Sequence, residues 1–296
     1  MKNSILIAGI ILLAASCSSE SDVTVSNPEV SYAPVSVHVS GFTSEQEEFA
    51  SARGLTRAVK DLATYTDVKA ITLAFYSGST EVFKSTQLRA DNTTYTTFGD
   101  FSTSLSVGSY TMVVLAYGSE SEITLTSPTS AAYTSDKGRE TFVYTQSVNV
   151  NTTSGLDLSA TLTRVVTKLK LKSTDNMPNN IAKVITNISA GGLSFNPTTG
   201  FATVNTGLTN EVSPSVGFGE IASFASYFFL ATDEQTVNVT ITVQDNAENV
   251  LFSKVVNNVP MKRNRCTVLS GKLFSTDATS TFSVETSWLD DHNVTF

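Results

Sequence analysis

The side chains that carry out most protein chemistry are scarce in this sequence. It contains two histidines, His38 and His292, and two cysteines, Cys17 and Cys266. Two histidines so far apart argue against a His-based catalytic triad, and none of the nucleophile-elbow, P-loop or dinucleotide-binding motifs occurs. We therefore expect no enzyme activity and no cofactor.

The acidic side chains lie in pairs that suit neither hydrolysis nor metal binding. Glu47-Glu48 and Asp290-Asp291 are adjacent residues, and adjacent side chains on a strand point to opposite faces, so neither pair can flank one bond. His292 follows the second pair, but a metal site needs ligands that converge from separate elements. We interpret residues 290–292 as a solvated tail and expect no metal site.

Cys17 ends the one segment that has the features of a targeting signal. Residues 1–17 hold a lysine near the start, an unbroken apolar run and small residues before the cysteine. The run is too short to span a bilayer comfortably, which favours a secretory signal peptide. The cysteine resembles that of the bacterial lipobox, although Ala14 stands where Leu is usual. The resemblance implies that Cys17 carries a diacylglycerol and acyl chains such as palmitate. The alternative is a free or buried cysteine after an ordinary signal.

Composition describes an exported, strand-rich body. Only 16% of residues are charged, whereas Thr, Ser, Val and Asn recur throughout, which favours strands over helices. The formal net charge of −8 argues against nucleic acid as a partner and against docking on anionic lipid by charge alone. If Cys17 is acylated, Cys266 has no disulfide partner within the chain, and we expect it to be a small buried residue.

The pattern of apolar and polar residues after the tether predicts a series of short strands. Residues 35–42 alternate apolar and polar side chains, which places His38 on the solvent side, whereas residues 43–67 lack that rhythm and predict a loop or a short helix. Further strands follow at short spacing, and no helix-period segment is long enough to cross between parallel strands. The clearest lie at residues 68–76, 111–118, 158–172, 237–243, 266–274 and 282–288.

This organisation predicts an all-β fold with two β-sandwich domains in tandem. After the signal peptide we expect a flexible tether at 18–32, an N-terminal sandwich at 33–156 and a C-terminal sandwich at 157–296. The polar cluster at 151–155 marks the boundary. Val165-Val166 interrupts the alternation of the strongest strand, which indicates a bulge or a strand that passes between domains.

Several of these segments, in this order, resemble the fimbrillin-like subunits and anchor proteins of the Bacteroidales. The segments are Cys17, residues 35–42 ending in Ser-Gly-Phe, residues 56–58 before 71–78, residues 162–171 and residues 259–271. The resemblance implies a lipoprotein with two transthyretin-like β-sandwich domains, anchored by lipid at the outer membrane and used in building surface fimbriae. It implies other fimbrial subunits as partners, joined by β-strand donation, and a role in adhesion to host or bacterial surface receptors.

The resemblance also implies two possible fates for the first strand. A polymerising subunit loses it when an arginine-specific protease cuts the chain, which here would follow Arg57 or Arg53, and a neighbour's strand fills the groove. An anchor subunit keeps its first strand and its lipid. The alternative for both arginines is that they are surface loop charges.

The C-terminal residues indicate which kind of fimbrial subunit this chain is. If residues 282–288 form an intrinsic strand, the remaining tail is short and acidic for a donor strand, which favours an anchor-like or tip-like accessory subunit. Lys262, Arg263 and Arg265 form a compact basic run that we interpret as a charged sheet edge.

One alternative from another functional class is a surface glycan-binding lipoprotein built from tandem β-sandwiches. Such a protein needs exposed aromatic rings, and Trp288 is the single tryptophan.

Overall fold

A computed structural model describes residues 30–46, 56–89, 98–118, 123–151, 153–214, 219–275 and 282–286. Within these ranges the secondary structure consists of β-strands and one short 3-10 helix, η1 (Leu62–Thr64). The all-β prediction is therefore confirmed. Ser31–Phe296 groups into one compact unit, and the division into two sandwich domains stays a prediction.

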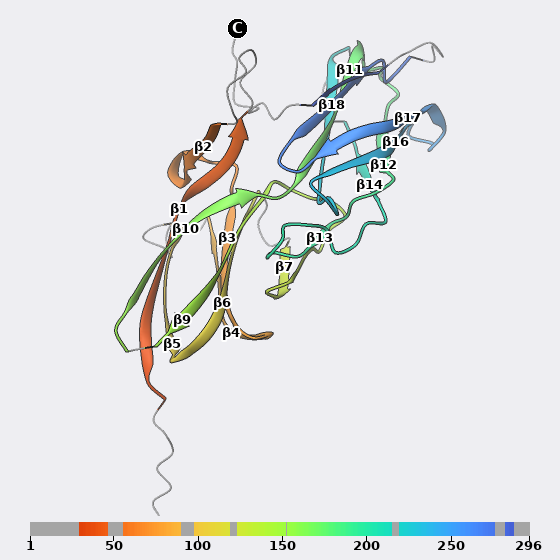
Figure 1. The fold of residues 1–296 in the computed structure, drawn as a ribbon. Helices are drawn as coiled ribbons and strands as arrows, with labels where there is room; N and C mark the ends of the chain where they lie inside the picture. Colours follow the sequence, from red (N-terminus) through yellow and green to blue (C-terminus); the bar gives the residue numbers. More distant parts are fainter. Residues whose placement is uncertain are drawn as a thin grey trace, which may run out of the picture. The chain divides into compact units, whose positions relative to one another are not determined.

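The first described strand lies inside the largest sheet (Figure 1), and two of its three neighbours come from distant parts of the sequence. The strand order is β2 (Thr56–Asp61), β1 (Tyr32–Gln46), β10 (Leu156–Arg164), β9 (Thr141–Val150), β6 (Gly108–Tyr117), β3 (Ala70–Ser77) and β4 (Thr80–Leu88), and β5 (Asp100–Ser106) also pairs with β1.

This sheet folds over on itself between β9 and β10. In the described residues these two strands pair at only two positions, Thr163 with Val143 and Arg164 with Phe142. A continuous apolar core takes side chains from β1, β5 and β10 and equally from β3, β6 and β9. The core therefore lies between two layers of one sheet, as in a sandwich.

Strand β3 explains why part of the sequence is apolar without alternation. Ile71, Leu73 and Phe75 enter the first core, whereas Ala70 and Ala74 face a second buried cluster. A strand that is covered on both faces is apolar at nearly every position, and the buried Thr72 has its hydroxyl hydrogen-bonded to that of Thr86. The second cluster is completed partly by residues of the small sheet β13 (Ser194–Phe195), β8 (Ser130–Tyr133) and β7 (Ile123–Ser127).

The C-terminal half contributes two four-stranded sheets around a third core. One has the order β15 (Ile221–Phe228), β11 (Thr167–Asn176), β18 (Cys266–Gly271) and β19 (Ser283–Thr286). The other has the order β14 (Leu208–Val212), β12 (Lys183–Ile188), β16 (Glu234–Gln244) and β17 (Val250–Lys262). Apolar residues of β11, β12, β15, β16 and β17 form most of this core.

The chain changes sheets at Val165-Val166, where the alternation of the sequence is interrupted. Strand β10 pairs with β1, whereas β11 pairs with β15 and β18. Both valines are buried. The boundary between two domains at residues 156 and 157 stays a prediction. Strand β10 belongs to the same sheet as β1.

The structure differs from the sequence-based expectation at residues 43–46 and 56–61. Strand β1 continues beyond Phe42 to Gln46 and β2 occupies Thr56–Asp61, where a loop or a short helix was expected, whereas η1 at Leu62–Thr64 is a short helix and agrees with that expectation. The polar side chains give no alternation here, yet residues 41–46 pair with β2 and residues 41–43 also pair with β10.

Candidate functional site

Strand β1 is the candidate functional site because it is both N-terminal and internal to its sheet. Ala33, Val35, Val37 and Val39 are at most 1% exposed, while the residues between them face solvent. The strand pairs in parallel with β10 on one side and antiparallel with β5 and then β2 on the other. Its alternating side chains fill pockets of the first core, and its backbone completes two hydrogen-bonded ladders.

The neighbour of β1 changes from β5 to β2 near Val39. The Val39 N–H donates to the carbonyl of Gly99, 3.0 Å away. Gly99 has a φ of +97°, and an added Cβ would lie 2.4 Å from Leu62, so only glycine fits there. The buried Gln87 side chain holds this corner, because its Oε1 accepts from the Gly99 N–H and its Nε2 donates to the Asp100 carbonyl.

The two candidate cleavage residues have different positions. Arg57 belongs to β2, where its backbone lies opposite Glu45 of β1, whereas Arg53 lies outside the described residues. A protease binds an extended, unpaired backbone, so cleavage after Arg57 needs β2 to leave β1 first. Processing at either residue stays a prediction.

A buried ionic cluster lies at the end of β10. Arg164 is 1% exposed, and its Nη2 lies 2.5 Å from Oε1 of Glu140. The same nitrogen donates to the Tyr65 hydroxyl at 2.9 Å, and that hydroxyl donates to Oε2 of Glu140 at 2.7 Å. Nη1 donates to Oδ1 of Asn264 at 3.3 Å. We call these residues, together with Phe142 beneath the guanidinium, the Arg164 cluster.

Electrostatics keep Tyr65 protonated in this cluster. Burial raises the pKa of Tyr65 far above its ordinary value of 10.0, and the negative charge of Glu140 raises it further, while Arg164 acts in the opposite direction. The neutral phenol can therefore accept from Arg164 and donate to Glu140 at the same time.

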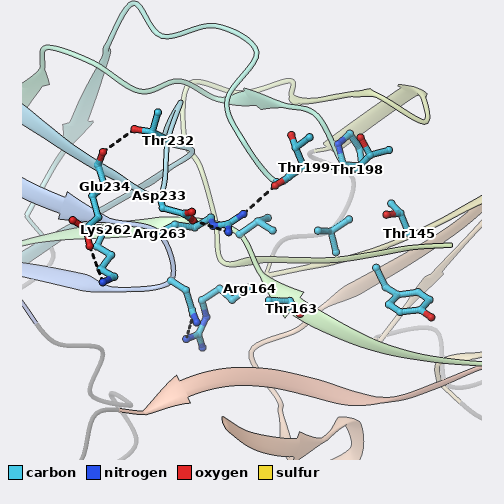
Figure 2. A pocket seen from close by; sticks show the side chains of 16 residues that line it. Thr145, Thr163, Arg164, Thr198, Thr199, Thr232, Asp233, Glu234, Lys262 and Arg263 are labelled. Carbon is cyan, nitrogen blue, oxygen red and sulfur yellow. Dashed lines mark hydrogen bonds and ion pairs between the residues drawn. The ribbon is translucent and has the colours of Figure 1, made fainter. Parts of the chain in front are cut away.

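Beside this cluster the structure has an open cleft with a volume of about 860 Å³. Its lining comes from β9, β10, the 197–200 turn, residues 232–234 and the 262–264 turn. Figure 2 shows Arg263 reaching towards Thr199, whose carbonyl accepts from Nη1 at 2.9 Å. Arg263 also pairs with Asp233 at 2.7 Å. Gly200, with a φ of +74°, leaves room for this guanidinium.

The basic run at 262–265 forms only part of the charged edge that the sequence indicated, since Lys262 ends β17, an edge strand of its sheet. Lys262 pairs with Glu234 at 2.8 Å and Arg263 with Asp233, whereas Arg265 is 1% exposed. The interpretation was wrong for Arg265 because the chain turns inward after Asn264, whose φ is 59°. Cys266 is buried, as expected.

His38 faces solvent, as its phase in the strand predicted, and its ring pairs with the Asp100 carboxylate across β1 and β5. Among the residues that the structure describes, no group of three His, Cys, Asp or Glu side chains could hold a metal ion. Over the same ranges, no helix is both long and apolar enough to cross a membrane. Cys17, Trp288 and the 290–292 cluster lie outside the described residues.

The sequence reasoning did not identify the Arg164 cluster. A signal was present, since Arg164 occupies the same phase of its strand as the buried Ala160 and Leu162. An arginine at an inward position needs a buried carboxylate partner. The identity of that partner, Glu140, depends on tertiary contacts.

The chain matches one protein family over most of its length. A family described as a family of unknown function (DUF6562) matches residues 33–296. No curated protein matches the sequence.

Several solved structures are similar in fold. A Bacteroides ovatus protein provisionally described as an adhesin is 13% identical, with a TM-score of 0.48 over 83% of this chain and 88% of that one. Bacteroides thetaiotaomicron proteins provisionally described as polysaccharide binding are 11% identical, with a TM-score of 0.46 over 88% and 100%. The fimbrial anchor protein Mfa2 of Porphyromonas gingivalis is 14% identical, with a TM-score of 0.41 over 87% and 98%. At these values the likeness carries no argument about function.

Proposed function

This chain belongs to the family of unknown function DUF6562, and we propose that it is a lipid-anchored subunit of surface fimbriae that acts in adhesion. In this proposal Cys17 carries the lipid at the outer membrane. The partners are other fimbrial subunits, which join through the position that β1 occupies. The sequence resemblance to fimbrillin-like subunits and anchors supports the proposal.

The observation that carries the proposal is the placement of β1. An N-terminal strand that lies between β10 and β5 or β2, with four consecutive inward side chains at most 1% exposed, cannot leave without exposing a long apolar groove. Such a groove has unpaired backbone groups along both walls. A strand of similar pattern from another subunit would satisfy both the backbone and the pockets.

The pairing of β2 with β1 bears on whether β1 is cut off by a protease or kept in place. Arg57 is protected by pairing with β1, so we expect a first cut at Arg53 when a protease acts on the folded chain. If neither arginine is cut, β1 stays in place and the chain acts as an anchor or accessory subunit with its lipid.

Intact-mass measurement of the full chain from cell envelopes, before and after a limited dose of an arginine-specific protease, tests the proposal. A mass that starts at Cys17 with acyl chains, and no stable cut near Arg53 or Arg57, indicates an anchor. Loss of the segment up to one of these arginines, with a stable remainder that polymerises, indicates a building block. The matched variants are Arg53→Gln and Arg57→Gln, each expected to abolish only its own product. An unlipidated chain that never co-purifies with fimbriae contradicts the proposal.

The cleft of Figure 2 favours a second candidate, a glycan-binding surface protein. Its volume is in the range of ligand sites, and its lining combines threonine hydroxyls with the half-buried ring of Tyr144. Titration of soluble oligosaccharides into the lipid-free body, followed by calorimetry, separates the two candidates. Binding that Tyr144→Ala and Thr199→Ala abolish would favour the glycan-binding role.

A further inference from the structure

Phe42 links the second half of β1 to the Arg164 cluster. Its ring, 1% exposed, lies 4.6 Å from the ring of Phe142 and 5.4 Å from that of Tyr65, measured between centroids. The Tyr65 and Phe142 rings meet edge to face at 5.5 Å. Arg164 lies over Phe142, with 5.1 Å from its Cζ to the ring centroid. One aromatic side chain of β1 therefore closes the apolar side of the pocket that holds the guanidinium.

The opposite side of the same guanidinium reaches the turn between β17 and β18. Asn264, 6% exposed, accepts from Arg164, and its own N–H donates to the Val166 carbonyl at 2.9 Å. The next residue extends the connection, because the Lys168 N–H donates to the Arg265 carbonyl at 3.0 Å. Asn264 thus connects Arg164 to the segment where the chain changes sheets, and it belongs to a turn that lines the cleft.

The stability of a buried ion pair depends on the exclusion of water around it. The attraction between Arg164 and Glu140 is strong only while the local dielectric constant is low. Phe42 contributes to that exclusion, since its ring covers those of Tyr65 and Phe142. Removing this ring admits water or leaves a void, which weakens the contacts that orient the guanidinium towards Asn264.

From these contacts we propose that Phe42 couples the seating of β1 to the order of the 262–265 turn, through the Arg164 cluster. The turn is well ordered when β1 carries an aromatic side chain at this position, and it opens more often when that side chain is missing. The coupling does not depend on the proposed function. It applies to a permanent β1, and it applies equally to any strand that replaces β1.

Hydrogen exchange on the full chain, followed by mass spectrometry of peptides that cover 262–268, tests the coupling. Phe42→Leu keeps an apolar side chain and removes the ring, and we expect about fivefold or faster exchange in the turn. Val37→Ala is the matched control, because Val37 is equally buried on β1 but lies about 17 Å away along the strand. We expect less than about twofold change in that variant. Equal acceleration in both variants, or none in Phe42→Leu, overturns the proposal.

A reciprocal measurement covers the case in which Phe42→Leu fails to fold. Asn264→Gly keeps the left-handed backbone, since φ is 59°, and removes the side chain that accepts from Arg164. Coupling is reciprocal, so the amides of residues 41–46 and 62–65 are expected to exchange about fivefold faster. Asn258→Gly is the control, because Asn258 also has a left-handed backbone, φ 57°, but belongs to β17. Unchanged exchange in β1 of the Asn264→Gly chain overturns the proposal.

Discussion

Nη2 of Arg164 lies 2.5 Å from Oε1 of Glu140, and the arginine side chain has no exposed surface. The residues come from β10 and from the segment just before β9, so the pair joins the two strands where the largest sheet folds over. Because Tyr65 and Asn264 also accept hydrogen bonds from the same guanidinium, the pair connects the end of η1 to the β17–β18 turn.

Removing Arg164 should destabilise the protein far more than removing an exposed cation. Arg164→Ala leaves Glu140 largely buried without its counter-charge, and we expect a loss of about 3–5 kcal/mol in the free energy of unfolding. Lys262→Ala breaks a pair whose side chains are 44% and 69% exposed, and we expect a loss of about 1 kcal/mol or less. Urea denaturation of both variants measures the difference, and equal small losses would contradict the role assigned to the cluster.

Stability should fall in alkaline solution because of Tyr65. The pKa of Tyr65 is raised in the folded state from an ordinary 10.0, so above pH 10 the unfolded chain loses this proton first. Each such group makes the free energy of unfolding decrease by about 1.4 kcal/mol per pH unit between its unfolded and folded pKa values. Tyr65→Phe should reduce that slope between pH 10 and 12 and leave the slope between pH 6 and 8 unchanged. An unaltered alkaline slope would be inconsistent with a protonated, buried Tyr65.

A charge on the inner face of β1 should unseat the strand, whereas one on the outer face should not. Val37 is 1% exposed and Ser36 faces solvent. Val37→Asp places an unpaired carboxylate in the core, and we expect at least about 3 kcal/mol of lost stability. Ser36→Asp should change stability by about 0.5 kcal/mol or less. Thermal unfolding of the two variants provides the comparison, and similar melting temperatures would show that β1 contributes little to the core.

The C-terminal strand should contribute to folding as an intrinsic element. Phe282 packs against the third core, and an added Cβ on Gly271 would lie 2.6 Å from its ring. Phe282→Ala should lower the free energy of unfolding by about 1–3 kcal/mol, less than for a fully buried ring. Val284→Ala, at a side chain that is largely exposed, should change it by about 0.5 kcal/mol or less.

Deletion of residues 281–296 extends this prediction to assembly. Strand β19 pairs with β18 in the chain's own sheet, so the deletion should impair folding as well as any polymerisation. Size-exclusion chromatography and circular dichroism of the truncated chain measure both. A stable monomer that has lost only the ability to polymerise would identify the tail as a donor strand.

Sequence patterning determined the fold class of this protein. Alternation at residues 35–42 reflects a strand with one face in the core, and the continuous apolar run at 111–118 reflects strand β6, which is covered on both faces. The interruption at Val165-Val166 marks the place where the chain changes sheets. These features are local, because the period of a strand and the burial of its faces are written in neighbouring residues.

Tertiary structure decided which strands meet and where buried charges lie. The parallel pairing of β1 with β10 joins residues more than a hundred positions apart, and no local pattern specifies that partner. Arg164 and Arg265 appear in the sequence as ordinary charges, yet each is 1% exposed. The burial of Arg164 is possible because the Glu140 carboxylate, the Asn264 side chain and the rings of Tyr65 and Phe142 converge on it from distant segments, and that convergence depends on the packing of the whole sheet.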